Sequence, residues 1–176
     1  MSETEHSSEL AIPEFPAAQI ELAARAILDG TVDDSFKSDP EIASRMILER
    51  ILNAETFEDA FAPQTLDSWR DMLDVPVRVT DIRFNRSSFQ GQGSPIYAVA
   101  DLVRLDTGEQ TTVTCGGRNV LMQLVSALKH GWLATHAVAM TARPTADGNT
   151  VLWLNTADHA AEKAEAKAAT ETDVPF

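Results

Sequence analysis

Apolar residues recur with helical spacing in the first third of the chain. Between Pro16 and Asp29 they fall three or four residues apart, which predicts an amphipathic helix that Gly30 ends. A second helix is expected from Asp39, because Asp is a good N-cap and Pro40 suits the first helical position. Two shorter helical pieces are expected at 56–61 and 65–73.

After Asp74 the apolar spacing changes from helical to alternating, and β-branched residues become frequent. Such segments, bounded by turns rich in Gly, Asp and Asn, indicate β-strands. Between the third and fourth of them, Asn119 can cap a helix that runs to about His130 and ends at Gly131. The strands are expected at 75–85, 96–105, 109–115, 137–143 and 150–155.

The first of these strands breaks its own alternation. Val77 and Val79 share one face, whereas Ile82 and Phe84 fall on the other. A β-bulge near Thr80-Asp81 would return both pairs to one core, because a bulge inserts one extra residue into a strand.

The resulting order is strand, strand, strand, helix, strand, strand. This is the order of the OB-fold, a Greek-key barrel with its helix between strands three and four. The expected fold is mainly β with α, a five-stranded OB-fold barrel at 75–156, although a generic α+β domain can share the order. The barrel would follow a disordered leader at 1–12 and an acidic helical region at 13–74, and precede a flexible acidic tail at 157–176.

Charge is distributed unevenly along these segments. The chain carries a net charge of −13, of which residues 1–74 hold −12 and residues 158–176 hold −3. Residues 75–157 hold +2. Because local sign decides where an anionic ligand binds, the predicted barrel is the part suited to nucleic acid.

The sequence offers little for catalysis, metal binding or membrane insertion. Cys115 is the single cysteine and the four histidines are scattered, so neither a disulfide nor a metal site is expected. No nucleophile lies at an informative spacing from a histidine, and we expect neither enzymatic activity nor a cofactor. No apolar run approaches the roughly 18 residues of a membrane span, and the acidic N-terminus is unlike a signal peptide, which favours a cytoplasmic location.

The last residues carry the sharpest motif. The segment Thr172-Asp173-Val174-Pro175-Phe176 resembles the C-terminal tip of bacterial and phage single-stranded DNA-binding proteins, which end in acidic residues, an aliphatic residue, Pro and Phe. The resemblance implies an OB-fold that coats and protects single-stranded DNA during replication, recombination and repair. It also implies that Asp173, Val174, Pro175 and Phe176 bind partner proteins. Residues 75–157 do not align with the core motifs of that family, which points to a divergent, phage-like relative.

Single strands are bound by cations that follow the phosphates and by aromatic rings that stack on bases. The predicted barrel supplies both kinds of side chain. The candidates are Arg78, Arg83, Arg86, Phe89, Tyr97, Arg118, Arg143 and Trp153. Three of them, Arg83, Arg86 and Phe89, fall at the end of the first strand and in the following loop, which is a binding loop in OB-folds.

Several aromatic and polar residues of this segment have a structural alternative. Phe84 and Trp132 are expected in the core, whereas Trp153 suits either the core or base stacking. The glycines before Arg118 could cradle a phosphate at a helix N-terminus, but a plain strand-to-helix turn is favoured. Asp101, on the strand of Tyr97, would repel DNA if exposed.

The leading hypothesis is therefore a protein that binds single-stranded DNA with little sequence preference and recruits replication and recombination proteins through its tip. The alternative is an acidic protein–protein adaptor or nucleic-acid-mimicking regulator, in which residues 1–74 grip a basic partner. The sequence leaves homo-oligomerisation, site size and the choice between DNA and RNA open.

Overall fold

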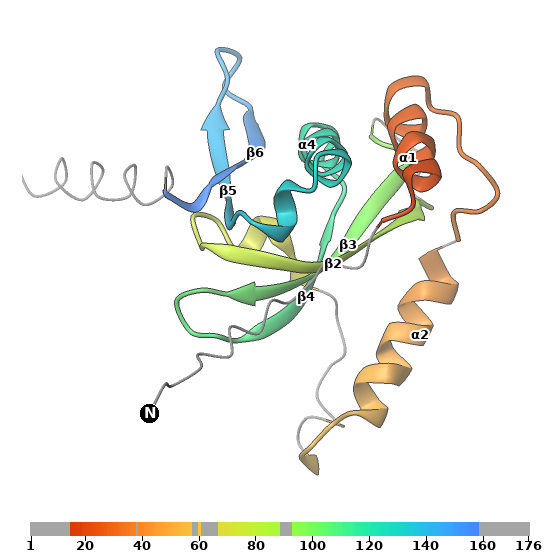
Figure 1. Cartoon of the computed structure of the whole chain (residues 1–176), viewed down its shortest axis with the longest axis vertical. Helices are drawn as coiled ribbons and strands as arrows, with labels where there is room; N and C mark the ends of the chain where they lie inside the picture. The colour runs from red at the N-terminus through yellow and green to blue at the C-terminus, as the bar shows by residue number, and fades with distance from the viewer. Residues whose placement is uncertain (1–14, 38, 58–59, 61–66, 89–92, 159–176) are drawn as a thin grey trace, which may run out of the picture.

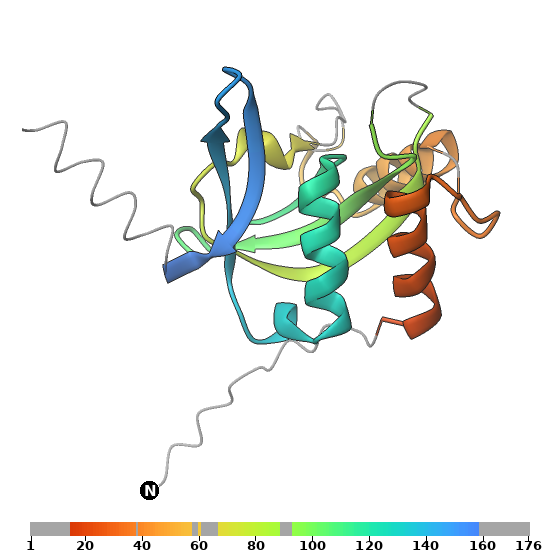
Figure 2. The ribbon, with the colours of Figure 1, turned by 90° about the horizontal axis from the view of Figure 1, so that it is seen from above.

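The computed structural model describes residues 15–37, 39–57, 60, 67–88 and 93–158. Its centre is one six-stranded, curled sheet in a mixed α/β architecture (Figure 1). Helices α1 (Ala17–Asp29) and α4 (Arg118–Lys129) lie side by side over one face of this sheet (Figure 2). Helix α2 (Asp39–Leu52) lies apart from them, against the second strand.

The sheet has the spatial order β1-β4-β3-β2-β5-β6. Its strands after residue 74 follow the predicted sequence order, with α4 between the third and fourth of them. The strands are β1 (Asp67–Ser68), β2 (Val77–Arg86), β3 (Ile96–Arg104), β4 (Gln110–Cys115), β5 (Val138–Pro144) and β6 (Thr150–Thr156).

The bulge predicted in β2 is confirmed. The register of the β2–β3 pair shifts between Val79 and Asp81, so that one extra residue is inserted there. As a result Val79 and Ile82 are both buried, although simple alternation would place them on opposite faces.

The helix expected at 65–73 is wrong within the described residues. Asp67 and Ser68 form β1, which pairs in parallel with β4, and η1 (Trp69–Asp71) is a short 3₁₀ helix. The Ser68 hydroxyl accepts a hydrogen bond from the Arg70 backbone N–H and caps this turn. Pairing with the free edge of β4 outweighs the weak helical preference of the segment.

Strands β5 and β6 form a hairpin that rises from the sheet on the side of the helices (Figure 1). The hairpin joins β2 through the pair Val77 and Val138. Its other strand is fixed to α4, because the Gln123 amide donates to the Leu154 carbonyl and accepts from the Leu154 N–H, each over 2.8 Å. The sheet therefore curls around α4.

Closure into a five-stranded barrel would require a strand pairing between β4 and β6. No such pairing occurs among the described residues, where the outer edge of β4 is paired with β1. The architecture is thus a curled, open sheet with the shape of an incomplete barrel.

Helix ends follow the expected chemistry at two glycines. Gly30 adopts φ 74° after α1, and Gly131 adopts φ 68° just beyond α4, a left-handed conformation that favours glycine. The start of α4 differs from the prediction, because its N-cap is Gly117 and not Asn119.

One continuous core joins α1, in the acidic helical region, to α4 and the sheet. Ala23, Ala26 and Ile27 of α1 are buried together with α4 and the inner face of the sheet. Trp69 is fully buried in the same cluster. The acidic N-terminal region therefore supplies part of the hydrophobic interior that supports the sheet.

In the described part of the chain, no helix is both long and apolar enough to cross a lipid bilayer.

Candidate nucleic-acid interface

The face of the sheet turned away from α1 and α4 carries several of the predicted binding residues. On β3, Ile96, Ala98 and Ala100 are buried on the inner side, so Tyr97 and Asp101 alternate to the outer side. Arg78 and Arg83 of β2 share that outer side, because the neighbouring valine and isoleucine side chains are buried in the core. We call this the outer face of β2 and β3.

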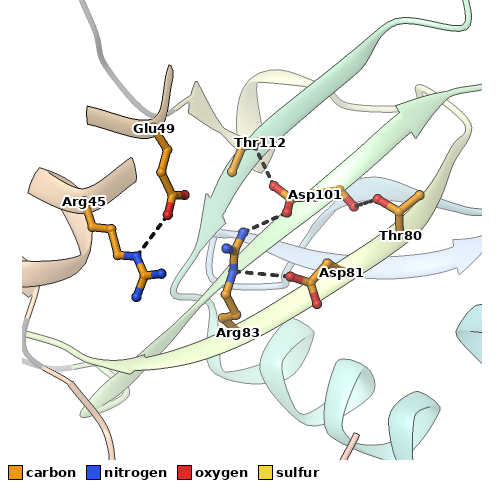
Figure 3. Close-up of polar contacts among 7 residues, drawn as sticks. All are labelled: Arg45, Glu49, Thr80, Asp81, Arg83, Asp101 and Thr112. Carbon is orange, nitrogen blue, oxygen red and sulfur yellow. Dashed lines mark hydrogen bonds and ion pairs between the residues drawn. The ribbon is translucent and has the colours of Figure 1, made fainter. Parts of the chain in front are cut away.

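Arg83 is engaged by two carboxylates on this outer face (Figure 3). Its Nη2 lies 2.7 Å from Asp101 Oδ2, and its Nε lies 3.5 Å from Asp81 Oδ2. Thr112 Oγ1 donates to Asp101 Oδ1 over 2.6 Å, which fixes the carboxylate on the neighbouring strand. Arg83 was predicted to meet DNA, but its charge is already compensated within the protein.

Arg86 lies at the end of β2 beside the acidic N-terminal region. Its guanidinium is 3.8 Å from Asp34, and its backbone N–H donates to the Lys37 carbonyl over 2.8 Å. The positive charge of Arg86 is thus partly offset by a carboxylate that lies far from it in sequence.

Arg78 presents a different environment at the opposite end of β2. Its side chain is exposed, and no polar partner for it occurs among the described residues. It directly follows Val77, the residue through which β2 joins the β5–β6 hairpin. Arg78 therefore offers an uncompensated cation between the outer face and the hairpin.

The hairpin brings Arg143 and Trp153 together on one side. Trp153 lies directly opposite Thr141, and Arg143 Nη2 donates to Asn155 Oδ1 over 3.3 Å. The Asn155 amide in turn donates to Thr141 Oγ1 over 2.6 Å. Arg143 is exposed and its partner is neutral, so its charge remains available, while Trp153 is partly exposed.

Tyr97 and the hairpin lie toward opposite ends of β2. Tyr97 pairs with Asn85, whereas the hairpin joins β2 at Val77, eight residues earlier. At the rise of an extended strand this separation is about 26 Å. The structure therefore places the predicted residues in two groups along β2, with Arg78 next to the hairpin group.

Arg118 stands at the first turn of α4, where a phosphate cradle was considered. Its Nη2 donates to the Leu28 carbonyl over 3.1 Å, at the C-terminal end of α1. This contact joins the two helices and satisfies a carbonyl that a helix end would otherwise leave unpaired. The guanidinium is nevertheless exposed.

Of the two aromatic residues predicted to lie in the core, Phe84 is buried and Trp132 is not. Phe84 is buried, and its ring packs edge to face against Phe15 with centroids 5.9 Å apart, which confirms its assignment to the core. The assignment of Trp132 is wrong, because its side chain is 50% exposed and stacks on His130 with centroids 4.6 Å apart. Gly131 turns the chain at the end of α4 and leaves the next residue at the surface, while Leu133 fills the core.

Sequence reasoning also missed an apolar pocket beside Trp132. Its volume is about 330 Å³, and its walls come from α4, η2 (Trp132–Ala134) and the end of β6. The sequence signal that could have suggested it is the bulky Trp132 directly after a helix-ending glycine.

A second, open hollow of about 250 Å³ lies beside Tyr97 and includes Cys115. Burial raises the pKa of the Cys115 thiol to about 11, despite a hydrogen bond from the Gly117 backbone that lowers it. The thiol is therefore neutral near pH 7, where the reactive thiolate is scarce. Among the described residues, no three metal-ligating side chains gather.

Phe89 and the predicted tip, Asp173 to Phe176, lie outside the described residues. No protein-family description, characterised protein or solved structure matches the chain.

Proposed function

We propose that this protein binds single-stranded DNA and acts in replication and recombination in the cytoplasm. The observation that carries the proposal is the spatial strand order β4-β3-β2-β5-β6 with α4 between β4 and β5 in sequence. This is the order of an OB-fold that has been opened between its third and fifth strands. In this interpretation β1 occupies the edge of β4 that a closed barrel would pair.

The single-stranded DNA would run along the outer face of β2 and β3 and onto the β5–β6 hairpin. Arg78 and Arg143 would contact phosphates, because no carboxylate pairs with them among the described residues. Tyr97 and Trp153 would stack on bases. Arg83 would serve mainly to hold Asp81 and Asp101, and its charge offsets one of their two negative charges, which reduces the repulsion of the phosphates.

The motif at Asp173 to Phe176 supports a second activity, the recruitment of replication and recombination proteins. An aromatic ring after a proline can fill an apolar pocket on a partner, and the proline limits the entropy lost on ordering. A homo-oligomeric state is compatible with this proposal.

The DNA-binding proposal is tested by titrating fluorescent oligo(dT) into the protein at several salt concentrations. With two phosphate contacts, the logarithm of the association constant should fall with the logarithm of salt concentration with a slope of about −1.4. The double variant R78A/R143A should bring this slope close to zero.

The matched control is R83A/D101A, which removes one positive and one negative charge from the outer face together. Its slope should stay within experimental error of the native value, because the Arg83 charge is compensated in the folded protein. A native slope of zero, or equal slopes for the two double variants, would contradict phosphate binding by Arg78 and Arg143.

The recruitment proposal is tested by capturing replication and recombination proteins on immobilised protein. Phe176→Ala should weaken capture about tenfold, since anchors that fill a pocket carry much of an interface's free energy. Phe176→Leu, which keeps an apolar side chain, should retain part of the capture. Equal capture by native and alanine forms would contradict recruitment through the tip without bearing on DNA binding.

A second candidate function is favoured by the surface of α2 and the residues after it. Large apolar side chains are exposed there, among them Leu48 at 59%, Leu52 at 81% and Phe57 at 72%. Such a group of exposed apolar residues is typical of a protein-binding surface. The adaptor hypothesis predicts that oligo(dT) does not bind at all, so the titration above separates the two functions.

A further inference from the structure

The apolar pocket beside Trp132 belongs to neither group of candidate DNA-binding residues. It is formed by Ala127 and Ser126 of α4, Trp132 and Leu133 of η2, and Leu154 and Thr156 of β6. Its volume of about 330 Å³ could accommodate a large apolar side chain with part of its backbone. Trp132 lines the pocket and is half exposed, and because His130 stacks on one face of its ring, the other face is the one on which an aromatic ring could stack.

Two polar side chains that line the pocket, Gln123 and Asn155, are occupied within the protein. The Gln123 amide is bound at both ends to the Leu154 backbone, and the Asn155 amide is bound to Thr141 and Arg143. The surface that lines the pocket is mostly apolar, so an apolar group is the better occupant.

The chain itself leaves the sheet at this pocket. Thr156 lines it, and the Ala157 N–H donates to the Ala137 carbonyl over 3.0 Å, which fixes the start of the C-terminal segment there. Residues 159–176 lie outside the described part of the structure. In their sequence no apolar side chain larger than alanine occurs before Val174, Pro175 and Phe176.

We propose that the pocket beside Trp132 binds the Val174-Pro175-Phe176 segment of the same chain, with Phe176 against Trp132. The intervening residues can span about 55 Å when extended, so they can leave the pocket rim and return to it. A tether of this length gives an effective concentration on the order of millimolar. This exceeds the micromolar concentrations of ordinary protein solutions and favours the chain's own segment over that of a second copy.

Docking would shield Phe176 from other proteins until a tighter-binding partner displaced it. This consequence rests on the proposed recruitment function, whereas the docking itself does not. The test therefore uses neither DNA nor a partner protein.

The experiment compares amide NMR spectra of the full chain and of a chain that ends at Thr170. The signals of Gln123, Ser126 and Leu154 should differ between the two, and the full-length Phe176→Ala variant should resemble the shortened chain. A peptide of residues 171–176 should restore the native signals of the shortened chain. It should bind the full chain about tenfold more weakly, because the tethered segment competes with it.

Two variants block the pocket in different ways. Trp132→Ala removes the exposed wall, and Ser126→Trp places a large side chain at the mouth from an exposed position. Either should weaken binding of the peptide to the shortened chain at least tenfold. Leu28→Ala, which removes an exposed apolar side chain at the end of α1, is the control and should bind the peptide like the native sequence.

The inference would be overturned by identical pocket signals in the full and shortened chains. It would equally be overturned if the differences grew with protein concentration, since a second copy would then be the occupant. Peptide-induced shifts confined to Arg78 and Tyr97 would show that the segment binds the outer face instead.

Discussion

Replacing Trp69 by alanine is expected to lower the free energy of unfolding by about 3–5 kcal/mol, the range observed for large aromatic side chains in protein cores. Trp69 is fully buried in η1, directly after the two residues of β1 that pair with β4. The side chain thus anchors a segment from the acidic N-terminal region into the core beneath the sheet. Urea denaturation followed by circular dichroism measures the loss.

Trp69→Phe is the matched control for this prediction. The indole Nε1 is buried and has no hydrogen-bond partner among the described residues, so phenylalanine removes no bond. It should cost a small fraction of the loss caused by alanine, through the smaller volume of its ring. An alanine variant within 1 kcal/mol of the native protein would show that residues 67–71 contribute little to the fold.

Local sequence rules predicted the features of the fold that depend on neighbouring residues. Alternation located the strands after Asp74, and its interruption at Thr80-Asp81 located the bulge. Gly30 and Gly131 ended their helices because both positions require a left-handed backbone. These features follow from residues a few positions apart, which a single sequence displays directly.

Features that depend on distant partners could not be predicted in this way. The strand β1 forms because its residues pair with the outer edge of β4. The paired residues Asp67 and Val113 are 46 positions apart in the sequence. A helical piece was expected at 65–73, yet the tertiary pairing prevailed.

The candidate site also depends on partners that are distant in sequence. Alternation along the predicted strand places Tyr97 and Asp101 on one face, where Asp101 would oppose DNA if exposed. It could not show that Arg83 neutralises Asp101, because the two residues meet only when β2 pairs with β3. Charge counts alone therefore overstate the cations available on the outer face, of which Arg78 is the clearest.

Replacing Tyr97 by alanine is expected to weaken oligo(dT) binding by about 1–3 kcal/mol, the usual contribution of an aromatic ring that stacks on a base. Tyr97 lies on the outer face of β3, partly exposed and opposite Asn85. Tyr97→Phe is the matched control: it keeps the ring and removes only the hydroxyl, so it should retain most of the affinity. Fluorescence titration at fixed low salt measures both variants, and urea denaturation verifies that each remains folded.

The salt dependence of oligo(dT) binding distinguishes the affinity lost with the Tyr97 ring from the affinity lost when a cation is removed. Stacking releases no counterions, so Tyr97→Ala should lower affinity by the same factor at every salt concentration and leave the slope unchanged. R78A should instead reduce the slope by about 0.7, the share of one phosphate contact on a single strand. If Tyr97→Ala bound oligo(dT) like the native protein while folded, the bases would have to lie elsewhere, and Trp153 on the hairpin would be the next ring to replace.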